Sequence, residues 1–275
     1  MPAPQASDMQ QKVKTSFRNM GIKLPVDWSD DKAPTQVELE KGDPGDLSSS
    51  SNWLFKPQTT MKLHVETAKT KSREFESYID GICTAICSAW STWQSAATIL
   101  GVIVVGPMAT GGVVLGVPMT PLILAQGPKS KPQEMLYTKT IATVIGLGWL
   151  QYTLTIKVPG LSWYPMFSAC PSPFAPPTPN TPCAVSALTQ VTTTISKDAL
   201  KSQMISMHGD PQAQFHKELF EAIADGFEQC FNSWQSQTQV TNVLGMGAVP
   251  TMASVPPVPG PVAGGVGLMT PGGFV

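Results

Sequence analysis

Three histidines are the residues of this 275-residue chain best suited to acid–base or metal chemistry, and their spacing favours neither. His208 and His216 are eight residues apart, too far to lie on adjacent turns of one helical face. His64 stands between Lys62 and Glu66, which is typical of a solvated surface. We therefore expect no histidine metal site.

The cysteines offer little more. They stand at positions 83, 87, 170, 183 and 230, an odd and irregularly spaced set. Neither a zinc motif nor the disulfide framework of a secreted protein follows from it. Cys83 and Cys87 are four residues apart and would share one helical face, so we expect buried packing thiols. A disulfide between subunits is the alternative.

Other catalytic patterns are missing from the sequence. It has no Gly-x-Ser-x-Gly motif, and the glycines of residues 106–116 are not followed by the Lys and Ser or Thr of a phosphate loop. Carboxylate pairs such as Asp30 and Asp31 lie in a polar segment where nothing would raise a pKa. We predict no catalytic residue, no cofactor and no metal, and a protein that is not an enzyme.

Charge is scarce and unevenly distributed. Only 13% of the residues are charged, whereas the chain has 23 glycines and 26 prolines. Residues 81–128, 158–196 and 229–275, 134 residues together, carry no charge. The net charge of −1 and the few basic residues exclude nucleic acid as a partner. A monomer would expose part of this neutral chain, so we expect other protein subunits to cover it.

The first 60 residues are polar and contain six prolines. They predict an extended N-terminal arm, anchored by Trp53 and Phe55, that either docks on a neighbouring subunit or stays a poorly ordered terminus. The chain begins without the apolar segment of a signal peptide, which predicts synthesis in the cytoplasm without secretion.

Two segments of the chain resemble each other. Phe75–Gly81 matches Phe220–Gly226, and four further landmarks follow both in the same order. They are Trp90 with Trp234, Leu100-Gly101 with Leu244-Gly245, Gly111-Gly112-Val113 with Gly264-Gly265-Val266, and Met119-Thr120-Pro121 with Met269-Thr270-Pro271. Chance supplies single pairs easily but not a register of this length. The pattern predicts an internal duplication.

Each copy is expected to begin with an amphipathic helix. Apolar residues recur every three or four positions from Phe75 to Trp93 and from Phe215 to Trp234, and Asp210-Pro211 predicts the start of the second helix. A charge-free Gly/Pro tract follows each helix. Residues 99–107 favour a strand, whereas residues 255–261 favour an extended, polyproline-like ribbon that must dock on another surface.

The region between the copies is rich in β-branched and aromatic residues. Thr140–Val158 predicts one or two strands, Leu188–Ile195 predicts another, and Val158–Pro182 predicts a fixed, Pro-rich loop. The predicted fold class is therefore α+β. Its parts are an extended arm (1–60), a first helix-plus-extended repeat (61–128), a strand and Pro-rich connection (129–200) and a second repeat (201–275).

A membrane-inserting protein is the alternative. Residues 96–125 carry no charge and exceed the roughly 20 residues that span a bilayer. However, the glycines and prolines of this tract would leave backbone groups without partners in lipid, and no basic cluster precedes it.

In its duplicated, charge-poor and Pro/Gly-rich organisation the whole chain resembles virion structural proteins of tailed bacteriophages and related contractile injection machines. No motif carries the resemblance, so no residues are transferred. Such tails join three-fold to six-fold parts, and three copies of a duplicated chain can meet a six-fold ring. The resemblance implies a trimeric baseplate or tail-hub subunit located in the virion or assembled particle. A collar, tube-associated or capsid-accessory role is the alternative.

The expected partners are copies of this chain and neighbouring structural proteins. The residues expected at these interfaces are large apolar side chains and the prolines of the C-terminal tract: Trp53, Phe55, Trp90, Trp93, Trp163, Phe174, Trp234, Pro256, Pro259 and Phe274.

Overall fold

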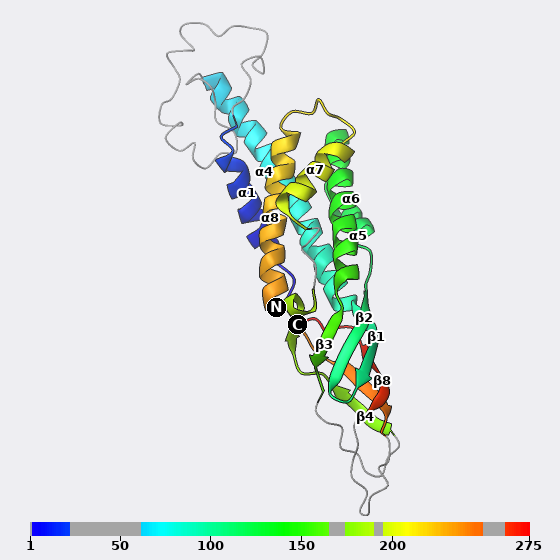
Figure 1. Cartoon of the computed structure of the whole chain (residues 1–275). Coiled ribbons are helices and arrows are strands. Elements are labelled where there is room, and N and C mark those ends of the chain that lie inside the picture. The colour runs from blue at the N-terminus through cyan, green and yellow to red at the C-terminus, as the bar shows by residue number, and fades with distance from the viewer. Residues whose placement is uncertain (1, 23–61, 165–173, 190–194, 250–261) are drawn as a thin grey trace, which may run out of the picture.

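The computed structural model describes residues 2–22, 62–164, 174–189, 195–249 and 262–275. It combines helices and strands, so the predicted α+β class is confirmed. Figure 1 shows an elongated molecule with the helices bundled at one end and the sheet at the other. The helices are α1 (Ala6–Asn19), α4 (Lys62–Ala96), α5 (Met119–Gln126), α6 (Pro132–Thr155), α7 (Lys197–Met207) and α8 (His216–Gln237), with a 3-10 turn at Val185–Leu188.

The main sheet has six strands, and each neighbouring pair is antiparallel. Their spatial order is β3-β2-β1-β8-β7-β4. The strands are β1 (Thr98–Val105), β2 (Met108–Leu115), β3 (Val158–Ser162), β4 (Phe174–Pro179), β7 (Val243–Ala248) and β8 (Ala263–Met269). A small second sheet pairs β5 (Cys183–Ala184) with β6 (Gln239–Val240). The chain thus continues from α4 into the antiparallel strand pair β1–β2 and from α8, after β6, into the antiparallel pair β7–β8.

An aromatic cluster joins the helical bundle to the sheet. α4, α6 and α8 each contribute buried rings, and Trp90 lies at the centre, in contact with Trp149, Phe227 and Trp234. Trp93 continues the cluster toward Phe274, the residue before the last. The apolar stripes of the two amphipathic helices therefore meet within one chain.

Three sequence expectations are wrong. Residues 6–19 are not an extended arm, because α1 buries Met9, Val13 and Phe17 against the bundle. Residues 140–155 are not strands, because they form most of α6, where burial against neighbouring helices outweighs the β-branched composition. The C-terminal tract 249–275 was expected not to pair as a regular strand over its length, but its residues Ala263–Met269 form β8, which lies between β1 and β7 inside the sheet.

Other expectations are corrected in detail or lie outside the described residues. α8 begins at His216 rather than near Asp210, which instead forms a turn by accepting a hydrogen bond from the backbone N–H of Gln212. The polyproline-like segment 255–261 and most of the expected strand 188–195 fall outside the described ranges. The strand prediction for residues 99–107 is confirmed by β1.

Candidate functional site

One face of the six-stranded sheet is apolar and exposed; we call it the outer face. The strands β1, β2 and β8 supply its large side chains, which are 36–57% exposed. They are Leu100, Ile103, Val105, Met108, Val113, Leu115, Val266 and Leu268. Monomeric proteins rarely leave so many neighbouring aliphatic side chains in water, so this face is the candidate functional site.

The strand register arranges these side chains in rows. Ile103 stands opposite Thr110 of β2 and Val266 of β8, and Val266 stands opposite Met246 of β7. Directly opposed residues have Cβ atoms about 4.5–5.5 Å apart, so this row is continuous across four strands. Leu100 and Val113 form a second opposed pair.

Glycines set which residues reach the outer face. Gly101 in β1 and Gly111 and Gly112 in β2 have φ values of +71°, +76° and +87°, which L side chains rarely adopt. The pairing of β1 with β8 shifts register between Ile99 and Val102. Because of this irregularity Leu100 and Ile103, three residues apart, are both exposed, and strict alternation would have placed them on opposite faces.

The opposite, inner face of the sheet is covered by the chain itself. Tyr164 lies so close to the strands that a Cβ atom at Gly245 would come within 2.7 Å of its ring. Its hydroxyl donates to the carbonyl of Val243 at 3.1 Å, and burial raises the pKa of Tyr164 to about 12. Trp93 contacts Gly116 beside the same face. The chain therefore covers the inner face of the sheet and leaves the outer face exposed.

The strands carry no charge, and prolines occupy the two edges of the sheet. None of the six strands contains Asp, Glu, Lys or Arg. Edge strand β4 contains Pro176, Pro177 and Pro179, and edge strand β3 contains Pro159. Proline lacks a backbone N–H, so these edges are poor templates for adding another strand.

A leucine stripe on α6 extends the apolar surface toward the sheet. Leu147, Leu150 and Leu154 recur at helical spacing and are 44–56% exposed. An open groove of about 600 Å³ lies between the end of α6 and the strands, lined by Leu154, Thr110 and Val158 among others. Through Thr110 this groove adjoins the row that contains Ile103.

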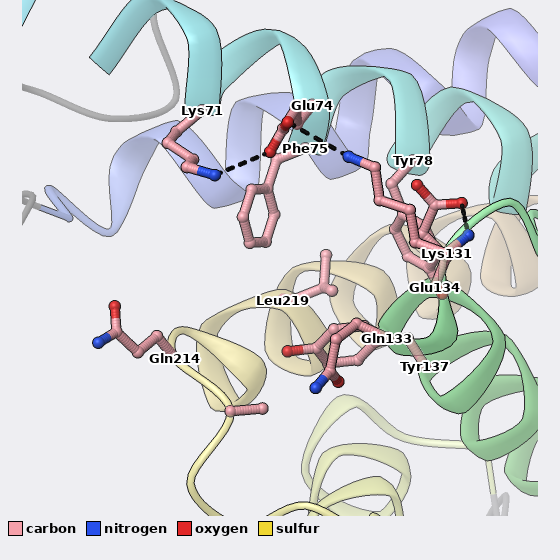
Figure 2. A pocket seen from close by; sticks show the side chains of 11 residues that line it. Lys71, Glu74, Phe75, Tyr78, Lys131, Gln133, Glu134, Tyr137, Gln214 and Leu219 are labelled. Carbon is pink, nitrogen blue, oxygen red and sulfur yellow. Dashed lines mark hydrogen bonds and ion pairs between the residues drawn. The ribbon is translucent and has the colours of Figure 1, made fainter. Parts of the chain in front are cut away.

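A separate pocket of about 270 Å³ lies in the bundle, and Figure 2 shows Phe75, Tyr137 and Leu219 around it. At its rim Glu74 accepts hydrogen bonds from Lys71 at 3.1 Å and Lys131 at 3.2 Å. Partial burial alone would raise the pKa of Glu74, but the two lysines hold it below its usual value. The rim carboxylate is thus paired with lysines, and the residues that line the pocket include no Ser, Thr, Cys or His.

His208, His216, Cys83 and Cys87 are packing groups. Although His208 and His216 are eight residues apart in the sequence, their rings are stacked with centroids 5.5 Å apart. Parallel rings do not converge on a metal, and within the described ranges no three His, Cys, Asp or Glu residues are grouped to hold one. Cys83 and Cys87 are buried as predicted, and burial raises the pKa of Cys87 to about 12.

The structure changes the predicted set of interface residues. Trp90, Trp93, Trp163, Trp234 and Phe274 are at most 3% exposed, so the expectation that they contact other subunits is wrong. They are buried because the helical bundle and its junction with the sheet enclose them. Phe174, in contrast, is 64% exposed and available for contact. Four more lie outside the described residues: Trp53, Phe55, Pro256 and Pro259.

Sequence reasoning missed the aliphatic residues of the outer face. In β1 the residues on both faces are apolar, so hydrophobicity alone does not tell which face the chain covers. The absence of charge from all six strands was the available signal.

None of the described helices is long and apolar enough to cross a bilayer. Residues 96–125, the candidate membrane segment, instead form the end of α4, the strands β1 and β2, and most of α5.

Comparison of the chain with protein-family models, curated proteins and solved structures gives no match.

Proposed function

We propose that this protein is a structural subunit of a multi-protein assembly and acts by binding other subunits rather than by catalysis. The outer face carries this proposal. Eight aliphatic side chains, each more than a third exposed, share an uncharged sheet whose inner face is already packed. Leaving apolar surface in water costs about 25 cal/mol per Å², so a face of this kind is stabilised by a partner.

The finer proposal is a virion-type subunit that bridges three-fold and six-fold parts. Its support is the repeated order of elements, in which α4 leads into β1–β2 and α8 leads into β7–β8. The strand order β2-β1-β8-β7 places the two pairs side by side in one direction, as neighbours in a ring would be. Three such chains would present six similar units to a six-fold partner.

The test is to find where the protein resides in the cells that encode it. A tagged chain expressed from its own locus should sediment with large particles, and electron microscopy of those particles should show density for it in every copy of one layer. A chain found only as a free small protein, with particles forming normally in its absence, contradicts the proposal.

A further inference from the structure

We propose that the outer face of one copy packs against the outer face of a second copy of this chain, as two sheets pack in a β-sandwich. The inference rests on the proposed function, since it names the partner of the same surface. It goes further by making the first contact of the assembly a contact between identical faces related by a symmetry axis.

The size of the face fits a self-contact. Six strands spaced about 4.8 Å apart, with roughly six residues rising about 3.3 Å each, cover about 600 Å². Two such faces would bury about 1,200 Å², which reaches the lower end of specific protein interfaces and exceeds most crystal contacts. The leucine stripe of α6 adjoins this area through Leu154 and would enlarge it, whereas the groove between them is also lined by Lys157.

The chemistry of the face also selects a copy of itself. With no charged residue in any strand, the outer face offers nothing to pair with a charged partner, and a charged surface placed on it would lose water without compensation. The face that matches it is one equally apolar and uncharged. The rows through Ile103 and through Leu100 provide such ridges in both copies.

Edge-to-edge pairing of the sheets is the competing geometry, and the prolines disfavour it. β4 has proline at three of its six positions, and β3 has Pro159. A neighbouring strand would find few backbone donors on β4, and Pro159 removes one donor from β3. Face-to-face packing needs none of them, because it is made by side chains.

The experiment measures the mass of the purified full-length chain by sedimentation over a concentration series. The test variant is Ile103→Asp, which buries a carboxylate in the contact. Ile103→Thr keeps a β-branched side chain and is the second variant. The control is Met135→Asp, since Met135 is 53% exposed against 55% for Ile103 but lies in the first turn of α6, far along the helix from the sheet. An acidic residue is also favourable near a helix N-terminus.

We expect the wild-type chain and Met135→Asp to form the same oligomer, and Ile103→Asp to weaken association at least about 100-fold, because an unpaired carboxylate is costly to bury. Ile103→Thr should associate with an intermediate strength. A wild-type circular-dichroism spectrum of this variant shows that the sheet folds. A wild-type chain that is monomeric at every concentration overturns the inference. So does an oligomer that both Ile103 variants leave unchanged. Neither result touches the proposed function, which depends on residence in the particle.

Discussion

The indole rings of Trp90 and Trp234 meet edge to face, with centroids 5.6 Å apart and planes at 67°. They occupy corresponding positions of the two similar sequence segments and are both fully buried. Their nitrogen atoms differ, however. Trp234 Nε1 donates to Gln94 Oε1 at 2.9 Å, whereas Trp90 Nε1 has no hydrogen-bond partner in the described part of the chain. The two tryptophans thus occupy similar sequence positions, but only Trp234 contributes a hydrogen bond to the stability of the described fold.

This difference predicts unequal effects of the same substitution. Trp234→Phe should lower the free energy of unfolding by about 1–3 kcal/mol more than Trp90→Phe, because it alone removes a buried hydrogen bond. Both variants lose similar apolar area, so each serves as the control of the other. Urea unfolding monitored by circular dichroism measures the two values. Equal losses would show that the bond to Gln94 contributes nothing.

The helical glycines predict two substitutions of opposite sign. A Cβ atom at Gly226 of α8 would collide with the Val13 side chain and come within 3.3 Å of the Val13 backbone nitrogen, so α1 would have to move. Gly226→Ala should cost about 1–3 kcal/mol. At Gly148 of α6 the nearest atom, in Leu200, would be 3.5 Å away, an ordinary contact. Gly148→Ala should therefore stabilise the protein by up to about 1 kcal/mol. Thermal unfolding of the two variants checks the signs, and a neutral Gly226→Ala would contradict the close packing of α1 on α8.

α1 should behave as part of the core. Phe17 is fully buried and stacks on Phe75 with ring centroids 5.6 Å apart, and Arg18 pairs with Glu76 at 2.8 Å. Phe17→Ala should reduce stability by about 3–5 kcal/mol. Thr15→Ala, on the exposed side of the same helix, should change it by less than about 0.5 kcal/mol. If instead both variants unfold at the same urea concentration as the wild type, α1 is a detachable arm after all.

Helical periodicity was the part of the fold that the sequence revealed. Spacings of three and four residues identified α4 and α8, and the Ile99–Pro107 run identified β1. These signals are local, because an amphipathic stripe or a β-branched run is contained in a short segment.

The parts that were missed depend on contacts between distant segments. α6 has little amphipathicity because its exposed side also carries apolar residues, among them Leu147, Leu150 and Leu154. On its buried side Gly146 packs directly against Thr120 of α5. β8 is rich in glycine, since Gly265 and Gly267 lie against Val104 and Val102 of β1, where a larger residue would collide. For the candidate site, composition indicated an uncovered apolar surface. It did not indicate that the aromatic residues would be used internally and the aliphatic ones left outside.

The last prediction concerns the stack of rings around His208. Its ring lies between Tyr137, with centroids 4.9 Å apart, and His216, and Phe220 meets it edge-on. Burial, and then the neighbouring His216, lower the pKa of His208, and Asp210 opposes this only in part. The folded state therefore binds a proton less readily than the unfolded state, whose histidines titrate near pH 6.5. As the pH falls below 6.5, His208 becomes protonated in the unfolded state but stays neutral in the folded state. The free energy of unfolding therefore decreases by up to about 1.4 kcal/mol per pH unit. Above that pH the penalty is absent.

The variant His208→Phe keeps the stacked ring but removes the titrating group. Its free energy of unfolding should therefore fall less between pH 7 and pH 5 than that of the wild type. Urea unfolding at several pH values in that range measures both slopes, and identical slopes would remove His208 as the cause.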